Sequence, residues 1–292
     1  MQLRIRPRRS VLYMPGSNSR AIEKARQLPA DCLILDLEDS VHPDEKAAAR
    51  NLVIAAVKQG GFGQREVVIR TNGLETPWGR KDLELAIESK ADAILLPKVE
   101  TAADIETTAE LLSKAGANHI AIWAMAETAR GISDLDAITR DQSRLEVIVI
   151  GTSDLGKELR VATSGQRTGL IHALSAAVLA ARANGLDIID GVHTALDDTE
   201  GFEAACRQGR ELGFDGKSLI HPRQIAAANK IFGISESAAD QARELVSVWR
   251  EASAAGKGVI VHRGQLIEQL HVDEAKRVLT LYAQLSAGDR QD

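Results

Sequence analysis

The sequence alternates eight short apolar runs with longer amphipathic stretches, and this alternation constrains its fold more than any other feature. Each run is apolar through its middle instead of at every second position, which is typical of strands buried on both faces of a parallel sheet. The predicted strands are residues 10–14, 32–36, 67–71, 93–97, 119–124, 147–150, 186–190 and 217–220. Because a helix can follow each of them, we predict an α/β fold, a (β/α)₈ TIM barrel.

A doubly wound α/β sheet is the alternative to a barrel. Such a sheet usually carries a glycine-rich dinucleotide turn after its first strand, with an acidic residue about 20 positions later. Residues 15–19 read Pro-Gly-Ser-Asn-Ser instead. Beyond the eighth strand come a helical stretch at 235–255, a glycine-rich hairpin at 256–264 and a last helix. We therefore predict a catalytic barrel over residues 1–232 and a C-terminal helical lid and oligomerisation extension over 233–292.

The composition excludes several classes of protein. A net charge of −5 excludes the strongly basic surface of a nucleic-acid-binding protein. The dense basic cluster of Arg4, Arg6, Arg8 and Arg9 is interpreted as a solvated tail, with a transit peptide as the less favoured alternative. No apolar run approaches the length of a membrane span. Cys32 and Cys206 lie far apart without a CxxC motif, which favours buried thiols in the cytoplasm.

Charged residues follow the predicted strands at the end where a barrel of this type holds its active site. Carboxylates follow four strands, and basic residues follow the two strands between; these residues are Asp36, Glu38, Asp39, Arg70, Lys98, Glu127, Asp154 and Asp190. Several carboxylates in one mouth raise each other's pKa, and a divalent cation removes this repulsion. Oxygen ligands suit Mg²⁺ or Mn²⁺, and Mg²⁺ typically takes one or two protein carboxylates.

Glu127 and Asp154 are the best pair of candidate metal ligands, since each follows an apolar strand and opens a loop into a helix. The alternative is that both are acids favoured by a helix dipole. The nearby Asp36, Glu38 and Asp39 are expected to orient the water ligands of such a metal. The seven histidines form no zinc-binding motif, so a zinc site is not expected.

Two loops are candidates for phosphate binding. Residues 151–158 approach the pattern GxxxxGK[ST], but Glu158 replaces the required hydroxyl, so nucleotide hydrolysis is not expected. The first turn suits an anion better, because residues 16–19 open a helix whose first N–H groups are free. Arg20 and Lys24 lie four residues apart and so share one face of that helix. The alternative is an ordinary capped surface helix.

Seven motifs together resemble the citrate lyase β-subunit-like family, the HpcH/HpaI aldolase/citrate lyase group of Mg²⁺-dependent acyl-CoA lyases. They are Arg-Ser-Val-Leu-Tyr-Met-Pro-Gly at 9–16, Leu-Asp-Leu-Glu-Asp-Ser-Val at 35–41, Arg-Thr-Asn-Gly at 70–73, Leu-Pro-Lys at 96–98, Glu-Thr-Ala-Arg-Gly at 127–131, Gly-Thr-Ser-Asp at 151–154 and Gly-Lys-Ser-Leu-Ile-His-Pro at 216–222. The motifs run from the first strand to the last. The resemblance implies a (β/α)₈ barrel with a C-terminal extension, assembled as a homotrimer or hexamer.

The resemblance also implies roles for individual residues. Glu127 and Asp154 would bind the metal, and the Glu38–Asp39 pair would orient metal-bound water. Arg70 would bind the carboxylate and oxo oxygens of the substrate. The remaining basic residues assigned to the substrate and its CoA phosphates are Arg20, Lys24 and Lys98.

One departure concerns the extension. Family members often present an Asp from the lid of a neighbouring subunit, and Glu268 stands at that position here. A side chain one methylene longer displaces the carboxylate by about 1 Å, which can cost 10²-fold in rate. We predict retro-Claisen cleavage of a 3-hydroxyacyl-CoA, such as malyl-CoA, β-methylmalyl-CoA, citramalyl-CoA or citryl-CoA, with Glu268 as a base acting in trans. The alternatives are a malyl-CoA thioesterase and a citrate lyase β subunit acting on a carrier-protein thioester.

Overall fold

The computed structural model describes residues 5–288. Within them the chain forms two compact units. One comprises residues 8–232, and the other comprises residues 233–288 together with residues 5–7.

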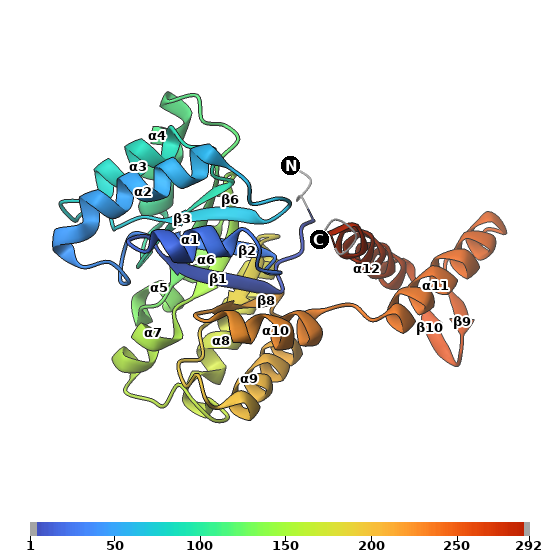
Figure 1. The fold of residues 1–292 in the computed structure, drawn as a ribbon. Helices are drawn as coiled ribbons and strands as arrows, with labels where there is room; N and C mark the ends of the chain where they lie inside the picture. Colours follow the sequence, from blue (N-terminus) through green and yellow to red (C-terminus); the bar gives the residue numbers. More distant parts are fainter. Residues whose placement is uncertain (1–4, 289–292) are drawn as a thin grey trace. The chain divides into compact units, whose positions relative to one another are not determined.

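The first unit is a closed barrel of eight parallel strands in sequence order, with β8 returning to pair with β1 (Figure 1). Its strands are β1 (Ser10–Pro15), β2 (Cys32–Asp36), β3 (Glu66–Arg70), β4 (Ala93–Leu96), β5 (Ala121–Ala126), β6 (Leu145–Ile150), β7 (Asp187–Asp190) and β8 (Gly216–Leu219). All eight predicted strands are present, with ends shifted by at most two residues. The predicted TIM barrel is therefore confirmed.

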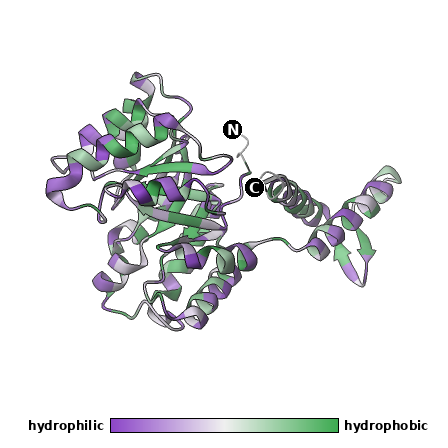
Figure 2. Cartoon of the chain, viewed as in Figure 1, coloured by the Kyte–Doolittle hydropathy of each residue, from purple (hydrophilic) through white to green (hydrophobic). Residues whose placement is uncertain are grey.

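Helices connect the strands and cover the outside of the barrel (Figure 1). They are α1 (Ser19–Ala25), η1 (Pro43–Glu45), α2 (Lys46–Gln59), α3 (Gly79–Ile87), α4 (Ala102–Lys114), α5 (Ala129–Ser133), α6 (Leu135–Thr139), α7 (Thr152–Leu159), η2 (Thr168–Leu170), α8 (Ile171–Ala183), α9 (Thr199–Leu212), η3 (Pro222–Gln224) and α10 (Ile225–Phe232). Figure 2 shows strongly hydrophobic strands and helices that carry their hydrophilic residues on one side.

Alternate strand residues pack into two separate cores, because successive side chains of a strand point to opposite faces. The barrel interior is lined by Val11, Cys32, Ile34, Val68, Ala93, Leu95, Trp123, Met125, Val147, Val149 and Ile189. The intervening residues, such as Leu12, Leu33 and Ile188, join a larger core beneath the helices. This alternation decides which strand-end side chains face the barrel mouth.

Arg8 lies buried at the N-terminal end of the barrel and is only 3% exposed. Its guanidinium pairs with Glu66 at 2.7 Å, Asp187 at 2.6 Å and Glu146 at 3.1 Å, and lies over the Trp123 ring. These acids are the first or second residues of three different strands, whose N-terminal ends meet around one arginine. The prediction of a solvated tail is therefore wrong at Arg8.

The neighbouring Arg9 is also tied to the barrel. Its backbone N–H and its guanidinium all donate to the Asp31 carboxylate at 2.8 Å. Arg6 is half-buried, and Arg4 lies outside the described residues. The sequence could not distinguish these cases, because the acids that pair with Arg8 and Arg9 lie between 22 and 179 residues away along the chain.

The second unit contains α11 (Glu236–Ala254), the hairpin of β9 (Ile260–His262) and β10 (Gln265–Ile267), and α12 (Gln269–Gly288). Trp249, Ile267 and Val272 form its small core. The hairpin turns at Arg263 and Gly264, which both have positive φ angles, as a two-residue hairpin turn requires. The predicted hairpin at 256–264 is therefore correct in kind, but its second strand lies beyond that range. No helix within residues 5–288 is long and apolar enough to span a membrane.

Candidate active site

A buried ion pair joins the ends of two adjacent strands. Asp36 ends β2, Arg70 ends β3, and the two residues are paired in the strand register. The Arg70 Nε and Nη2 atoms donate to the two Asp36 carboxylate oxygens at 2.6 and 2.7 Å. Burial alone would raise the pKa of Asp36, but the Arg70 guanidinium outweighs burial and lowers it. Asp36 is therefore an anion that holds the Arg70 side chain in place. Both of its oxygens already accept hydrogen bonds, so it is not a free acceptor for metal-bound water.

The rest of the Arg70 guanidinium faces the carboxylates that follow β2. Its Nη1 atom lies 2.8 Å from Glu38 Oε2 and 3.6 Å from Asp39 Oδ2. The Glu38 oxygen lies off the hydrogen-bond direction, so this contact is an ion pair. The Tyr13 ring packs against the guanidinium, with the Arg70 Cζ atom 4.9 Å from its centroid. A substrate carboxylate would therefore share Arg70 with acids of the protein, and its binding to Arg70 stays a prediction.

Lys98 connects the Glu38 and Glu127 carboxylates. Its Nζ atom donates to Glu38 Oε1 at 2.9 Å, and its backbone N–H donates to Glu127 Oε1 at 2.9 Å. Burial lowers the pKa of Lys98, but the hydrogen bond to Glu38 and the charges of the nearby carboxylates together outweigh burial and raise that pKa. The residue has a φ of 48°, a conformation that costs energy for a non-glycine residue and that clusters at functional sites.

Glu127 follows β5 and is 2% exposed. Burial raises the pKa of its carboxyl group to about 7, although the Lys98 N–H opposes the shift. Its Oε2 atom faces Gly151, where a Cβ atom would lie only 2.3 Å away. Asp154 lies in the first turn of α7, directly beyond Gly151, and is half-buried. Glycine is thus required where the Glu127 carboxylate approaches the start of α7.

The residues at this end of the barrel fit Mg²⁺ or Mn²⁺. Across residues 5–288 no group of three or more His, Cys, Asp or Glu side chains could hold a metal, so the protein offers a pair of carboxylates at most. Mg²⁺ needs no more than one or two carboxylates from a protein, whereas a zinc site needs three or four ligands. A nearby cation would also favour the charged form of the buried Glu127. Metal binding by Glu127 and Asp154 remains a prediction that this chemistry supports.

Comparison with known proteins identifies the family and supports the fold. Residues 9–222 match the HpcH/HpaI aldolase/citrate lyase family. The chain belongs to this family. It is 46% identical over 273 residues to a (3S)-malyl-CoA thioesterase of Cereibacter sphaeroides, covering 94% of each chain. The resemblance to the family inferred from the sequence motifs is therefore confirmed, and the chain is an enzyme of the aldolase/citrate lyase family.

Three further proteins match at lower identity. The chain is 34% identical to the citrate lyase β subunit of Leuconostoc mesenteroides, covering 94% of this chain and 93% of the relative. It is 32% identical to an L-malyl-CoA/β-methylmalyl-CoA lyase of Cereibacter sphaeroides, covering 97% and 96%. The crystal structure of CitE from Mycobacterium tuberculosis in complex with magnesium, acetoacetate and coenzyme A aligns with a TM-score of 0.73 at 28% identity, over 94% of this chain and 97% of that one.

Asp190 does not face the barrel mouth, contrary to the prediction from its place at the end of β7. Its neighbour Ile189 points into the barrel, so Asp190 points outward. Its carboxylate is fully buried, approaches Gly209 of α9 and pairs with Lys217 and Arg167. A polar residue at a strand end reaches the mouth only if its side chain points into the barrel and not outward. A run that is apolar at every position does not show which of its residues point inward.

Arg20 and Lys24 lie exposed on α1, and neither has an ion-pair partner among the described residues. Asn18 caps this seven-residue helix by accepting a hydrogen bond from the Ala21 N–H at 3.0 Å. Gly16 is needed before it, because a Cβ atom there would lie 2.5 Å from the Asp36 carbonyl oxygen. The geometry is that of a capped surface helix, and the contact of Arg20 and Lys24 with CoA phosphates stays a prediction.

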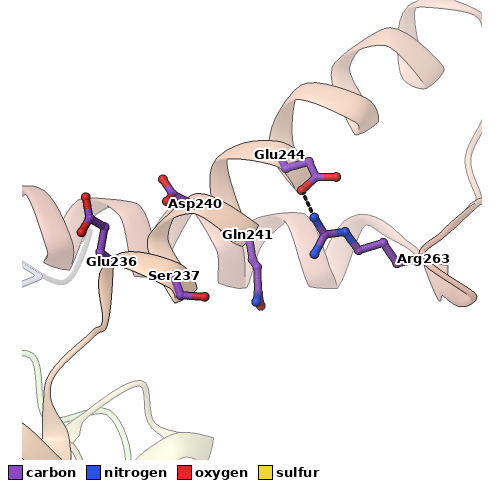
Figure 3. Close-up of a pocket in the computed structure, with 6 residues that line it drawn as sticks. All are labelled: Glu236, Ser237, Asp240, Gln241, Glu244 and Arg263. Carbon is purple, nitrogen blue, oxygen red and sulfur yellow. Dashed lines mark hydrogen bonds and ion pairs between the residues drawn. The ribbon is translucent and has the colours of Figure 1, made fainter.

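Glu268 lies in the second unit, between β10 and α12. It is half-buried, and its backbone N–H donates to His271 Nδ1 at 3.1 Å. The same unit carries a groove of about 420 Å³ lined by Glu236, Ser237, Asp240, Gln241, Glu244 and Arg263 (Figure 3). Three of these side chains are carboxylates, which repel the phosphates of CoA. The groove is therefore not the candidate active site.

One group of residues behind the strand-end carboxylates carries no recognisable sequence signal. Lys46 donates to the backbone of Leu37 and Glu38 and to the side chain of Asn72. The Asn72 amide in turn donates to Asp82 at 2.5 Å. Lys46 resembles any lysine at the start of a helix until the fold brings β2, β3 and α2 together.

Proposed function

We propose that this chain is a Mg²⁺-dependent thioesterase that hydrolyses a 3-hydroxyacyl-CoA of the malyl-CoA class. The supporting observation is its 46% identity to a (3S)-malyl-CoA thioesterase over 94% of both chains, against 32% to a malyl-CoA lyase. The sequence motifs alone favour carbon–carbon cleavage, because they resemble a family of acyl-CoA lyases. They do not separate its lyases from its thioesterases, since the whole family shares them. The relatives now favour hydrolysis on the same scaffold.

In this reaction a water molecule adds to the thioester carbonyl carbon, and the C–S bond breaks. The products are the free 3-hydroxy acid and CoA, whose thiol receives a proton. Asp39, with a side chain 61% exposed beside Arg70, is the accessible carboxylate that takes the proton of the water. Glu127 and Asp154 would hold Mg²⁺, which would act as a Lewis acid on the substrate oxygens. Arg70 and Lys98 add fixed positive charge beside the reacting group.

Product analysis tests this proposal directly. The purified protein is incubated with (3S)-malyl-CoA and Mg²⁺, and CoA esters and organic acids are separated by chromatography. We expect malate and free CoA. Acetyl-CoA and glyoxylate would instead assign the protein to the lyases, the second candidate, whose site residues it shares. Turnover only of a carrier-protein thioester would assign it to the citrate lyase β subunits.

Arg70 is the residue whose substitution tests the substrate-binding side of the site. Arg70→Lys keeps a charge but cannot hold Asp36 through two parallel hydrogen bonds while also facing Glu38. We expect kcat/KM for malyl-CoA to fall by about 10²-fold, with a raised KM. Arg207→Lys, an exposed change on α9, is the matched control. Initial rates indistinguishable from wild type would remove Arg70 from the site.

We also propose that residues 233–292 act as a lid over the barrel of an adjacent subunit in a homotrimer or hexamer. The hairpin supports this, since Val261 and Leu266 are paired across the strands and are 72% and 58% exposed. Leu270, at the start of α12, is 62% exposed, and Figure 2 shows a largely hydrophobic hairpin. Apolar surface of this kind marks a contact with another protein. Glu268 lies between Leu266 and Leu270 and would reach the partner's barrel mouth.

Subunit exchange tests the lid. We expect Glu268→Ala and Glu127→Gln proteins to be inactive alone and to regain part of the wild-type activity when mixed, because some barrels then meet an intact partner lid. Exchange is verified by native mass spectrometry. Confirmed exchange without recovery of activity, or a fully active wild-type monomer, would contradict the lid in trans.

A cytoplasmic location is a further part of the proposal. Cys32 and Cys206 are both buried and unpaired, as in proteins of a reducing compartment. Subcellular fractionation with an antibody to the chain tests this location, and recovery with extracytoplasmic fractions would contradict it.

A further inference from the structure

Lys46 is a buried cation that no step of the proposed reaction uses. It is the first residue of α2 and is 6% exposed. A positive charge at this end of a helix opposes the helix dipole, and burial lowers the pKa of its ammonium group despite nearby carboxylates. Helix stability therefore gives no reason for a lysine here.

The contacts of Lys46 converge on one short segment. Its Nζ atom donates to the carbonyl oxygens of Leu37 at 2.9 Å and Glu38 at 2.7 Å, and to Asn72 Oδ1 at 2.8 Å. An ammonium group has three protons, and each has a partner here. The two carbonyls belong to the peptide bonds on either side of residue 38. The backbone N–H of Glu38 is also bonded, because it donates to Asp36 Oδ1 at 2.9 Å.

The consequence is that the backbone around Glu38 is held at three points. The direction of the Glu38 side chain follows from its backbone, and that side chain meets Arg70 and Lys98 at the barrel mouth. The Trp78 ring, whose centroid lies 5.3 Å from Nζ, covers the Lys46 ammonium group. The cluster around Lys46 is thus built to keep Glu38 in one position.

We propose that Lys46 is a positioning residue that sets the Glu38 carboxylate against the metal and substrate site. This inference rests on the proposed Mg²⁺-dependent function and deepens it. Lys46 touches neither substrate nor metal in this proposal, and it acts through Glu38. Loss of Lys46 displaces a carboxylate that orients the ligands of the metal. Loss of groups that orient metal ligands typically changes metal affinity or activity by 10- to 100-fold.

The first experiment compares Lys46→Met with wild type, since methionine fills much of the lysine volume without the charge. Mn²⁺ binding is followed by electron paramagnetic resonance, and hydrolysis of malyl-CoA is followed separately. We expect a Mn²⁺ dissociation constant raised about tenfold or more and a kcat lowered about 10²-fold, with KM changed by less than about threefold. Lys58→Met, exposed in the last turn of α2, is the matched control and should match wild type.

Two further measurements separate positioning from a structural role. In Lys46→Ala, propylammonium replaces the atoms removed and should restore part of the Mn²⁺ affinity and kcat, whereas tetramethylammonium has no N–H donors and should not. Because Lys46 acts through Glu38, the double variant Lys46→Met/Glu38→Gln should be little worse than Glu38→Gln alone. Circular dichroism establishes that each variant is folded.

The outcomes separate a failure of the proposed metal-dependent function from a failure of the role of Lys46. Wild-type protein that binds no Mn²⁺ would overturn the metal-dependent function and Lys46's role together. Wild-type protein that binds Mn²⁺, with a Lys46→Met variant of equal affinity and kcat, would overturn the role of Lys46 alone. A folded, impaired Lys46→Ala variant without rescue by propylammonium, or full additivity with Glu38→Gln, would assign Lys46 a structural role and overturn positioning.

Discussion

Glu127→Gln should lower Mg²⁺-dependent turnover by about 10³-fold, equivalent to roughly 4 kcal/mol of transition-state stabilisation, and leave the barrel folded. Glutamine keeps the shape of the side chain and its hydrogen bond from the Lys98 N–H, but it loses the negative charge that a metal requires. The measurement is the rate of malyl-CoA hydrolysis across a Mg²⁺ titration. Glu110→Gln, an exposed change on α4, is the control.

The same substitution should stabilise the metal-free protein at alkaline pH. The carboxyl pKa of Glu127 is raised by burial from 4.5 to about 7, so the folded state holds a proton that the unfolded state releases. Stability is therefore lost as the pH rises from about 4.5 through 7, by roughly 3 kcal/mol in total. Glutamine carries no such penalty. In EDTA, Glu127→Gln should exceed wild type in unfolding free energy at pH 8 and match it at pH 4.5.

Two results would contradict this account of Glu127. Wild-type turnover by the variant at limiting Mg²⁺ would show that Glu127 is not a ligand. Equal urea midpoints for the variant and wild type at both pH values would show that the buried carboxylate is compensated within the protein, and a metal would then not be needed to hold its charge.

The barrel was predictable because its signal is local. Most strands are short runs with an apolar middle; in Cys32–Asp36 every residue is apolar until the last, and every residue of that strand is buried in the structure. Burial on both faces is a property of the run itself. The family motifs at the strand ends add the positions of Glu127 and Asp154, which the fold places at the same end of the barrel.

The connections among the site residues were not predictable, because they depend on side-chain phase and on partners far away in sequence. Asp36 and Asp190 both end a strand, yet one binds Arg70 at the barrel mouth and the other faces α9. Arg8 is buried by acids from three strands. Lys46 is tied to Asn72, 26 residues away. No local pattern distinguishes these residues from surface charges.

The Asp190 cluster is expected to give the largest change in stability. Arg167 Nη1 donates to both Asp190 oxygens at 2.8 and 2.9 Å, and Lys217 Nζ donates to Oδ2 at 2.7 Å. Asp190 and Lys217 are fully buried, and Arg167 is 3% exposed. Burial would raise the pKa of Asp190, but Lys217 and Arg167 outweigh it and lower that pKa. One carboxylate thus neutralises two buried cations only in part.

Asp190→Asn should therefore lower the unfolding free energy by about 3–5 kcal/mol, because it leaves Lys217 and Arg167 buried without a counter-ion. Lys217→Met should change it by less than about 1 kcal/mol, because the remaining Asp190–Arg167 pair is neutral, Arg167 Nη1 still donates to both carboxylate oxygens, and methionine fills much of the lysine volume. Urea denaturation of the two variants at pH 7 makes the comparison. An Asn variant as stable as the Met variant would mean that solvent reaches the cluster, whereas the predicted order would establish that Asp190 stabilises the barrel beneath α9 as the counter-ion of Lys217 and Arg167.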